Sequence, residues 1–336
     1  MKRFKNKILI LSGIVCALGV ICMGVAMLTV GFDVKALDLC GEPQKVSESY
    51  NVQDIKSVLV KLQNSNIAVK KSDDEKIHIT YYTTDCCPTK AEVSQNNELM
   101  LYDNFWDYGI KQYTKGFFHG YKKHGLVTVI EIPENDNINI VVDISNGNIT
   151  AENIELNKAE FYSSNGYLDF SDISADTLCA DTSNGYITAD NINAESAKID
   201  TSNGDVQVSG LTAQKFNAYT SNGSITFKNI IAKNTEASTS NGDVYLTDVK
   251  SNNSLNASTS NGSVNIEDIS SENISLETSN GSIQGNIIGN HDEYRISSST
   301  SNGNDSLAIY NGKNQTADKK IEAYTSNGNI LIEFTE

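Results

Sequence analysis

The sequence lacks the short motifs that mark common enzyme active sites. No G-x-S-x-G, H-E-x-x-H or Walker A pattern occurs, and Gly312-Lys313-Asn314 lacks the Ser or Thr and the upstream glycine of a phosphate-binding loop. Only four histidines are present, none with a nucleophile or metal ligand at a suitable spacing. These absences favour a non-catalytic protein. A polysaccharide lyase or hydrolase, whose site would use clustered carboxylates, stays the enzymatic alternative.

Cysteine is also scarce. Outside an apolar N-terminal segment the chain has only Cys40, Cys86, Cys87 and Cys179, too few for a disulfide framework. Cys86 and Cys87 are adjacent and precede Pro88, which predicts a turn and leaves a vicinal disulfide open. Two thiols with no His or acidic ligand at zinc-site spacing give little indication of a metal. No metal or cofactor is therefore expected.

Charge is absent from a long segment near the start of the chain. Residues 1–7 carry four positive charges and no negative one, and residues 8–32 carry no charge at all. A helix of that length crosses a bilayer of about 30 Å, and the basic flank stays in the cytoplasm. The sequence predicts a cytoplasmic tail over 1–7, a single-pass transmembrane anchor over 8–32 and an extracellular remainder in the cell envelope. A cleaved signal peptide ending at Val34-Lys35-Ala36 is the alternative, although the apolar segment is longer than usual for one.

Positive charge is deficient in the rest of the chain. Beyond the N-terminal tail, 22 Lys and Arg face 42 Asp and Glu, a balance of about −20. Such a field repels phosphate backbones, so a nucleic-acid partner is not expected. A solvated acidic coat explains this charge, and attraction to a cationic partner or to divalent ions is the alternative.

What the sequence has in abundance is one tripeptide. Ser-Asn-Gly occurs ten times, and six of the nine intervals are 19 residues. A fixed period of this size predicts a repeat architecture, in which each unit buries its apolar face against its neighbours. Apolar residues recur two, four and seven positions after the glycine. The first two columns share one face of a strand, and the step to seven requires a bend, which polar pairs such as Glu152-Asn153 and Ser171-Asp172 supply.

The repeats predict an all-β fold, a parallel β-solenoid of about ten 19-residue coils. The tripeptide is expected to turn the chain because glycine permits positive φ and asparagine tolerates the left-handed region. An antiparallel meander is the alternative, since Asn-Gly also forms hairpins. Parallel stacking would set Asn over Asn and Thr over Thr about 4.8 Å apart and satisfy the side-chain amides. The predicted structural turn residues are Asn146, Gly147, Asn165, Gly166, Asn184, Gly185, Asn203, Gly204, Asn222, Gly223, Asn241, Gly242, Asn261, Gly262, Asn280 and Gly281.

The segments outside the regular repeats receive separate predictions. Residues 33–54 are assigned as a linker, 55–140 as irregular β-rich first coils, and 141–336 as the repeat solenoid. Asn64-Ser65-Asn66 resembles a degenerate copy of the later corner. At the other end, residues 330–334 alternate in a way that predicts a closing strand.

Residues 104–125 have the most unusual local composition. They contain seven aromatic residues, including the single Trp, together with Lys and His side chains that make the segment basic. Three interpretations stay open: a plug for the open end of the solenoid, a loop that binds glycan or peptide, and a contact with the membrane surface. The predicted ligand-binding residues are Trp106, Tyr108, Tyr113, Phe117, Phe118 and Tyr121.

The N-terminal anchor, the irregular β-rich entry ending at Ile132-Pro133 and the recurring S-N-G-x-[IV] coils resemble the putative-adhesin β-solenoid family of bacterial cell-envelope proteins. That family is similar to domains of Lia-type envelope-stress proteins, and the resemblance covers residues 55–336. It implies an exported, non-enzymatic domain with a role in adhesion or in sensing and protecting the envelope, and it carries over no catalytic residues. We therefore expect a membrane-anchored, adhesin-like or scaffolding surface whose partner is an envelope polymer. The alternative is an envelope-stress regulator that contacts a membrane sensor protein or a cationic antimicrobial peptide.

Overall fold

The computed structural model describes residues 18, 19, 21, 22, 24, 25, 28, 42–85, 88–103, 125–134 and 138–335. The chain forms two units, one of residues 1–44, 83–88 and 104–124 and the other of residues 45–82, 89–103 and 125–336. The predicted anchor, the adjacent pair Cys86-Cys87 and the aromatic segment 104–125 lie largely outside the described residues and stay predictions. In the described part of the chain, no helix combines the length and the apolar character that crossing a membrane requires.

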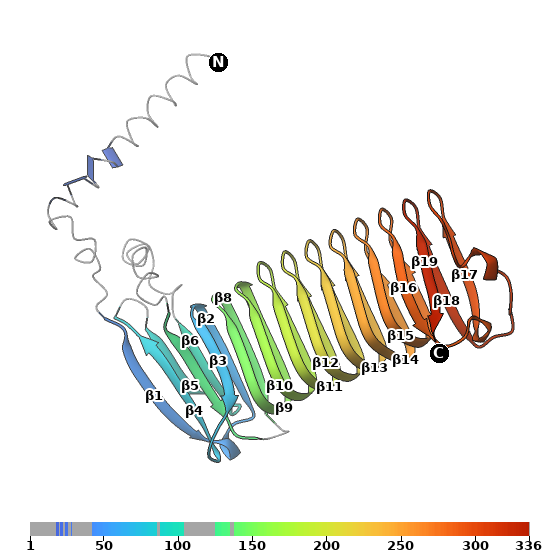
Figure 1. The fold of residues 1–336 in the computed structure, drawn as a ribbon. Coiled ribbons are helices and arrows are strands. Elements are labelled where there is room, and N and C mark those ends of the chain that lie inside the picture. Colours follow the sequence, from blue (N-terminus) through green and yellow to red (C-terminus); the bar gives the residue numbers. More distant parts are fainter. Residues whose placement is uncertain are drawn as a thin grey trace. The chain divides into compact units, whose positions relative to one another are not determined.

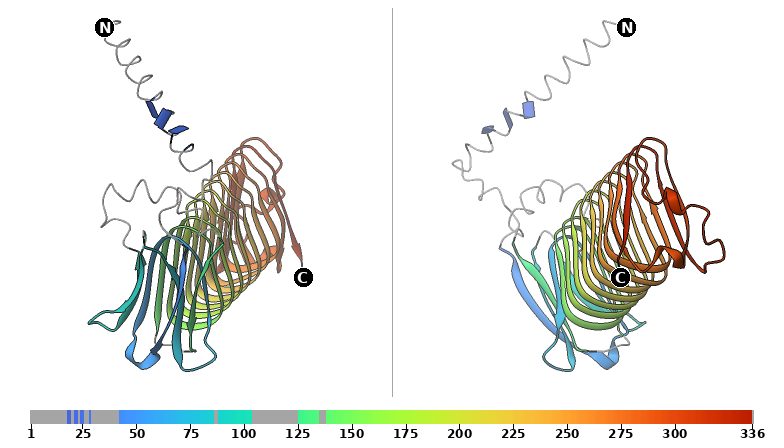
Figure 2. Two further views of the ribbon diagram at one scale, coloured as in Figure 1. Left: turned by 90° about the vertical axis from the view of Figure 1, so that its left-hand side faces the viewer. Right: turned by 45° about the vertical axis from the view of Figure 1, so that its right-hand side comes forward.

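The second unit is a solenoid of parallel strands (Figure 1). Each long strand runs from one Ser-Asn-Gly corner to the next and pairs in register with the strands one repeat before and after it, so that Leu168 lies opposite Ile149 and Ile187. Figure 2 shows these coils stacked one behind another. This register confirms parallel stacking for the repeats and excludes the meander. The strands are β9 (Ile149–Asn165), β10 (Leu168–Thr182), β11 (Ile187–Thr201), β12 (Val206–Thr220), β13 (Ile225–Thr239), β14 (Val244–Ser258) and β15 (Val264–Glu277).

Each long strand bends six residues after its glycine, as the polar pairs predicted. The bending residue is Asn, Asp or Gly, and its φ is positive. These residue types adopt the left-handed region at the least steric cost. The residues, with their φ values, are Asn153 (53°), Asp172 (53°), Asn191 (54°), Gly210 (65°), Asn229 (54°), Asp248 (53°) and Asp268 (52°).

The interior is filled by the predicted inward columns. In one coil Ile187, Ala189 and Ile192, at two, four and seven positions after the glycine, are all 2% exposed or less. Large and small side chains lie opposite each other in adjacent coils: Phe170 lies opposite Ala151, and Phe161 lies opposite Ala180. The two phenylalanine rings then pack against each other with centroids 4.9 Å apart. Interiors are close-packed, so each coil is held in place by the side chains of its neighbours.

The corner glycines are required by contact between coils. Only Gly147 among them has a positive φ, so the expectation that the corner needs left-handed backbone is wrong for the others. A Cβ added at Gly204 would lie 1.8 Å from the carbonyl oxygen of Gly185, and the equivalent distance is between 1.8 and 2.1 Å at every other corner. A carbon atom cannot approach a backbone oxygen this closely. The glycine therefore allows neighbouring coils to touch.

The corner asparagines form the predicted ladder. The amide nitrogen of Asn203 donates to Oδ1 of Asn184 at 2.8 Å, and that of Asn222 donates to Oδ1 of Asn203 at 2.7 Å. The same bond recurs from the degenerate corner at Asn64 to the corner at Asn302. Side-chain amides are thus satisfied along the axis, as they are in cross-β stacks.

The threonines before the corners lie opposite one another as predicted, Thr201 opposite Thr182 and Thr220, and their hydroxyl groups bond to the backbone. Thr201 donates its hydroxyl to the carbonyl oxygen of Gly185 at 2.8 Å, and Thr220 donates to that of Gly204 at 2.9 Å. The hydroxyl therefore satisfies the same carbonyl that excludes a side chain at the next corner.

At the N-terminal end the order of the stack differs from the order of the sequence. Strands β2 (Ser57–Asn64) and β3 (Asn66–Lys71) pair with β8 (Asn139–Asn146) and β9 on one side. On the other side they pair with the later strands β6 (Glu98–Asp103) and β7 (Val127–Ile132). Strands β4 (Lys76–Thr83) and β5 (Thr89–Val93) then add antiparallel to β7 and β6. Strand β1 (Gln44–Asn51) pairs with β4, so the linker assigned over 33–54 is wrong for these residues.

The C-terminal end shows the same interleaving. Strand β18 (Lys319–Thr325) lies between β15 and β17 (Tyr294–Thr300), and β19 (Ile330–Thr335) pairs with β16 (Ile283–Ile288) (Figure 1). The prediction that residues 330–334 close the solenoid is therefore wrong, because β17 lies one layer further out.

The outer edge of β17 is covered by a side chain. The amide of Asn311 donates to the carbonyl oxygen of Ser298 and accepts from its N–H, both at 2.8 Å. This pair imitates a neighbouring strand at one position and blunts an edge that could otherwise recruit another strand.

We predict that Gly204→Ala will destabilise the solenoid by about 3–5 kcal/mol, because its Cβ would collide with a backbone oxygen that cannot move aside. Gly210→Asn is the matched control: Gly210 occupies the bend where other coils have Asn, with no backbone atom closer than 3.5 Å to an added Cβ. This variant should fold with unchanged or slightly higher stability. Chemical denaturation measures both, and equal effects would refute the contact explanation.

We also predict that deleting residues 311–336 will release residues 294–310. The deletion removes β18, on which β17 depends, so amide hydrogen exchange should become fast in β17 while β10 to β13 stay protected. If the coils instead stacked in sequence order, residues 294–310 would keep their protection.

Candidate functional site

The structure describes the predicted corner residues but not the predicted ligand-binding residues. The six aromatic residues of segment 104–125 lie outside the described part of the chain, and their role stays a prediction. The corner Asn and Gly residues are described, and they contact the equivalent residues of adjacent coils. Candidate sites in the described residues therefore come from the outer faces, which show three features.

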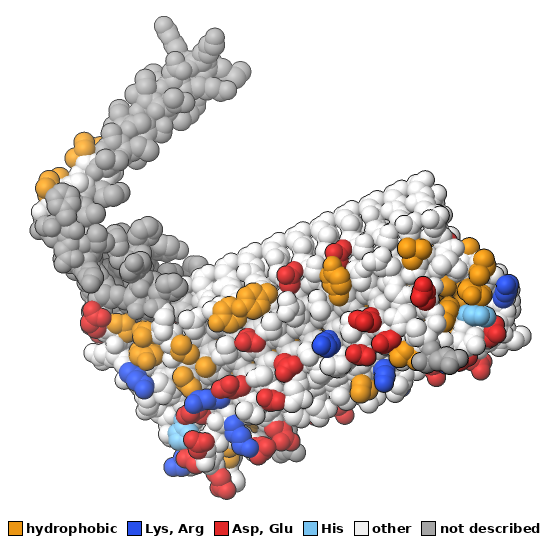
Figure 3. All heavy atoms as spheres, in the orientation of Figure 1, with side chains coloured by type: hydrophobic (Ala, Val, Ile, Leu, Met, Phe, Trp, Pro, Cys, Tyr) orange, Lys and Arg blue, Asp and Glu red, His pale blue; other side chains and the backbone are white. Residues whose placement is uncertain are grey.

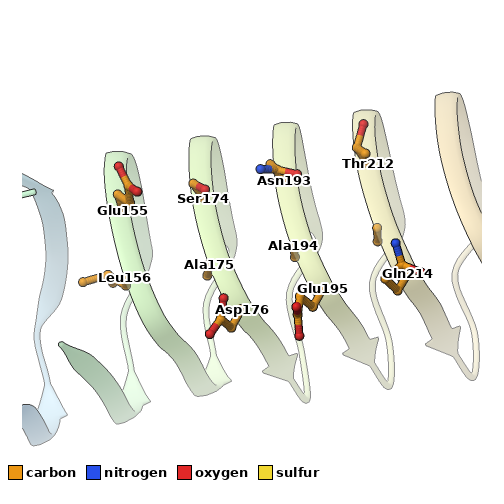
Figure 4. Close-up of a pocket in the computed structure, with 11 residues that line it drawn as sticks. Glu155, Leu156, Ser174, Ala175, Asp176, Asn193, Ala194, Glu195, Thr212 and Gln214 are labelled. Atoms are coloured by element: carbon orange, nitrogen blue, oxygen red, sulfur yellow. The ribbon is translucent and has the colours of Figure 1, made fainter. Parts of the chain in front are cut away.

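An open groove runs along one side of the solenoid, across successive coils (Figure 4). Ala175 and Ala194, nine positions after their glycines, lie along the groove between two rows of longer side chains, and Ala213 lines the groove at the same position of the next coil. Its volume is about 270 Å³, and it continues into a second groove of about 430 Å³ that shares Ala213 and reaches Lys233. The first stretch carries the acidic residues Glu155, Asp176 and Glu195. An open groove of this kind can contact an extended chain but does not enclose a small substrate.

A second feature is a pair of carboxylates on the face formed by the second halves of the long strands. Asp181 of β10 and Asp200 of β11 lie directly opposite each other, with Tyr162 and Tyr219 opposite them in the next coils out. Lys198 forms an ion pair with Asp200. Oδ1 of Asp200 nevertheless has no hydrogen-bond partner among the described residues.

The electrostatics of this face follow from the pairing. Burial and the neighbouring Asp200 carboxylate raise the pKa of Asp181. Burial also raises the pKa of the adjacent Cys179 thiol, which accepts a hydrogen bond from the Tyr162 hydroxyl at 3.7 Å. A thiol in this environment stays protonated and is a poor nucleophile. Within the described ranges, no group of three or more His, Cys, Asp or Glu side chains is arranged to hold a metal ion.

The third feature is a pair of tyrosines that the sequence reasoning missed. Tyr167 and Tyr186 each follow a corner glycine, and their rings stack at 5.1 Å between centroids with planes 5° apart. Tyr186 is 48% exposed. The available signal was compositional: in the other regular coils the residue after the corner glycine is Asn, Asp or Ser. Figure 3 shows apolar side chains scattered singly and in small groups among Asp and Glu on one face of the molecule.

We predict that Asp181→Asn will stabilise the protein at pH 7 by up to about 1 kcal/mol, because like charges directly opposite each other in a sheet repel. The folded-state pKa is raised, so Asp181 weakens stability once pH rises through the unfolded and then the folded pKa. The advantage of the variant should therefore shrink as pH falls through the raised folded-state pKa and disappear below the unfolded value of about 3.9. Asp190→Asn is the control, since Asp190 lies opposite Ser171 and Ser209. Equal effects of the two variants at pH 7 in thermal melts would contradict the repulsion.

Comparisons with known proteins agree with this architecture. A family model described as Toastrack DUF4097 matches residues 55–229 and 213–292. No curated protein sequence matches the chain.

Three solved structures are similar to the chain. A putative adhesin from Bacteroides fragilis is 16% identical with a TM-score of 0.39, and the match covers 86% of this chain and 97% of that one. A putative cell adhesion protein from Clostridium sporogenes is 11% identical with a TM-score of 0.25, covering 88% and 100%. A putative lipid binding protein from Parabacteroides distasonis is 10% identical with a TM-score of 0.38, covering 87% and 97%. Likenesses this distant say nothing about function, but the family match spans most of the chain, and the protein belongs to the Toastrack DUF4097 family.

Proposed function

We propose that this protein is a non-catalytic, adhesin-like or scaffolding surface of the bacterial cell envelope, held at the outer face of the membrane by residues 8–32. The observation that carries the proposal is the groove that crosses successive coils. Parallel coils repeat every 4.8 Å or so, so residues along the axis recur at short, fixed intervals. A surface of this kind suits an extended envelope polymer better than a single small molecule.

The state of the carboxylates supports a binding role over a catalytic one. Acid pairs that act as general acid and base lie in a shared cleft with their pKa values pushed apart. Here three carboxylates of the outer faces pair with neighbours on the same sheet: Glu160 with Lys158 at 2.8 Å, Glu236 with the Tyr219 hydroxyl at 2.5 Å, and Asp200 with Lys198. The pair Asp181 and Asp200 lines neither of the two grooves. Such pairs are typical of a solvated, structural face.

A sedimentation assay with purified bacterial peptidoglycan sacculi tests this function. The full-length chain, kept in mild detergent, should sediment with the sacculi. The triple variant Trp106→Ala, Phe117→Ala, Phe118→Ala should sediment less, with an unchanged melting temperature, if the aromatic segment contributes a ligand contact. Unchanged sedimentation with a lower melting temperature would favour the plug interpretation of that segment.

Failure of the full-length chain to sediment would refute the proposed function. Binding only to a cationic antimicrobial peptide, with an affinity that falls steeply as salt rises, would instead favour the envelope-stress alternative.

A further inference from the structure

A second hydrogen-bond ladder runs beside the corner asparagines. At most corners, the side chain of the residue after the glycine accepts a hydrogen bond from the backbone N–H of the equivalent residue in an adjacent coil. Asn148 accepts from Tyr167 at 3.1 Å, and Asp205 accepts from Ser224 at 2.8 Å. The bond recurs from Asn66 to Asn304, at distances of 2.7 to 3.2 Å.

Tyr167 and Tyr186 interrupt this ladder in two consecutive coils. A phenol ring has no acceptor near the backbone, and the N–H groups of Tyr186 and Asp205 have no hydrogen-bond partner in the part of the chain that the structure describes. The solenoid therefore forgoes two stabilising hydrogen bonds at this place alone. Departures from an otherwise consistent structural pattern tend to mark functional positions.

The geometry of the two rings leaves their faces partly open. Their planes are almost parallel, but the centroids are 5.1 Å apart. Stacked carbon atoms lie about 3.5–4 Å apart at contact, so the two rings are not in close face-to-face contact, and Tyr186 is 48% exposed. Tyr167 and Tyr186 directly precede the strands β10 and β11. They present a fixed strip of aromatic surface.

Hydrogen-bonding groups surround this strip. Asp169 and Thr188 lie opposite each other beside the rings, and the Thr188 hydroxyl donates to the Asp169 carboxylate. Neither tyrosine hydroxyl has a hydrogen-bond partner among the described residues. Aromatic faces next to hydroxyl donors and carboxylate acceptors match a sugar ring, which has apolar C–H faces and hydroxyl groups at its rim.

We propose that Tyr167 and Tyr186, with Asp169 and Thr188 beside them, form a platform for a neutral sugar chain. This inference rests on the proposed function, because it names the class of polymer that the surface holds. The charge of this face disfavours anionic polymers: Glu152, Asp169, Asp190 and Asp205 lie on it, and no Lys, Arg or His occurs in the first five positions after the corner glycine of these four coils.

The acidic residues of this face would also attract a cation, and the phenolic hydroxyl groups are what distinguishes the two kinds of ligand. The carboxylates nearest the rings already accept hydrogen bonds, Asp169 from Thr188 and Asp205 from the Ser224 N–H. The unpaired groups include the two phenolic hydroxyl donors, which a cation cannot use. A sugar hydroxyl can accept from these donors and donate to the second oxygen of Asp169.

The test measures binding of a neutral N-acetylglucosamine hexamer to the full-length chain by calorimetry, at low and high salt of about 0.05 and 0.5 M. The wild type should bind with an affinity that salt does not change. The double variant Tyr167→Asn, Tyr186→Asn should bind about tenfold more weakly or worse. It should remain folded, since asparagine restores the ladder in place of the ring stack, and a melting temperature within a few degrees of the wild type checks this.

Tyr245→Asn is the matched control, because Tyr245 is 40% exposed and lies further along the solenoid, away from the pair. Its affinity for the hexamer should equal that of the wild type. The proposal is overturned if the wild type does not bind the hexamer, if the double variant binds it unchanged, or if a lysine hexamer binds instead and is released by salt. Sedimentation with sacculi in the absence of hexamer binding would overturn this platform and leave the proposed function standing.

Discussion

The fold depends on direct contact between the backbones of successive coils at the Ser-Asn-Gly corner. The carbonyl oxygen of one corner glycine lies where the Cβ of the next would be. Because the corner has no side chain in this position, the coils stack in register, and the adjacent asparagine and threonine reach the groups of the preceding coil. Register, amide ladder and carbonyl satisfaction are therefore consequences of one steric requirement.

In-register stacking also determines how the outer faces can vary. Each outward position becomes a column along the axis, and identical polar residues in a column bond to one another or to the backbone. Two places differ from this pattern: the identical Asp181 and Asp200 repel each other, and the column that contains Tyr167 and Tyr186 lacks two hydrogen bonds. Such departures are where a repetitive protein can carry specificity without changing its core.

The two ends of the solenoid use the chain differently from its middle. A stack of parallel strands leaves an unpaired edge at each end, and such edges recruit other strands. Here the chain inserts an early segment between later ones at the N-terminal end and a late segment between earlier ones at the C-terminal end, and Asn311 occupies part of the outermost edge. Contacts between residues far apart in sequence thus hold the terminal coils, whereas the central coils rely on neighbours one repeat away.

The sequence by itself determined the coil: its period, its inward columns at Ile187, Ala189 and Ile192, the bend at residues such as Asn191, and the asparagine ladder from Asn64 onward. These features follow from the local alternation of a strand and from a constant repeat, both of which are visible in one dimension. Only the tertiary structure showed the close contact that requires glycine at the corner, the stacking order of the terminal strands β17 to β19, and the contact between Tyr167 and Tyr186. Those outcomes depend on distances between coils and on segments without a repeat, which periodicity does not encode.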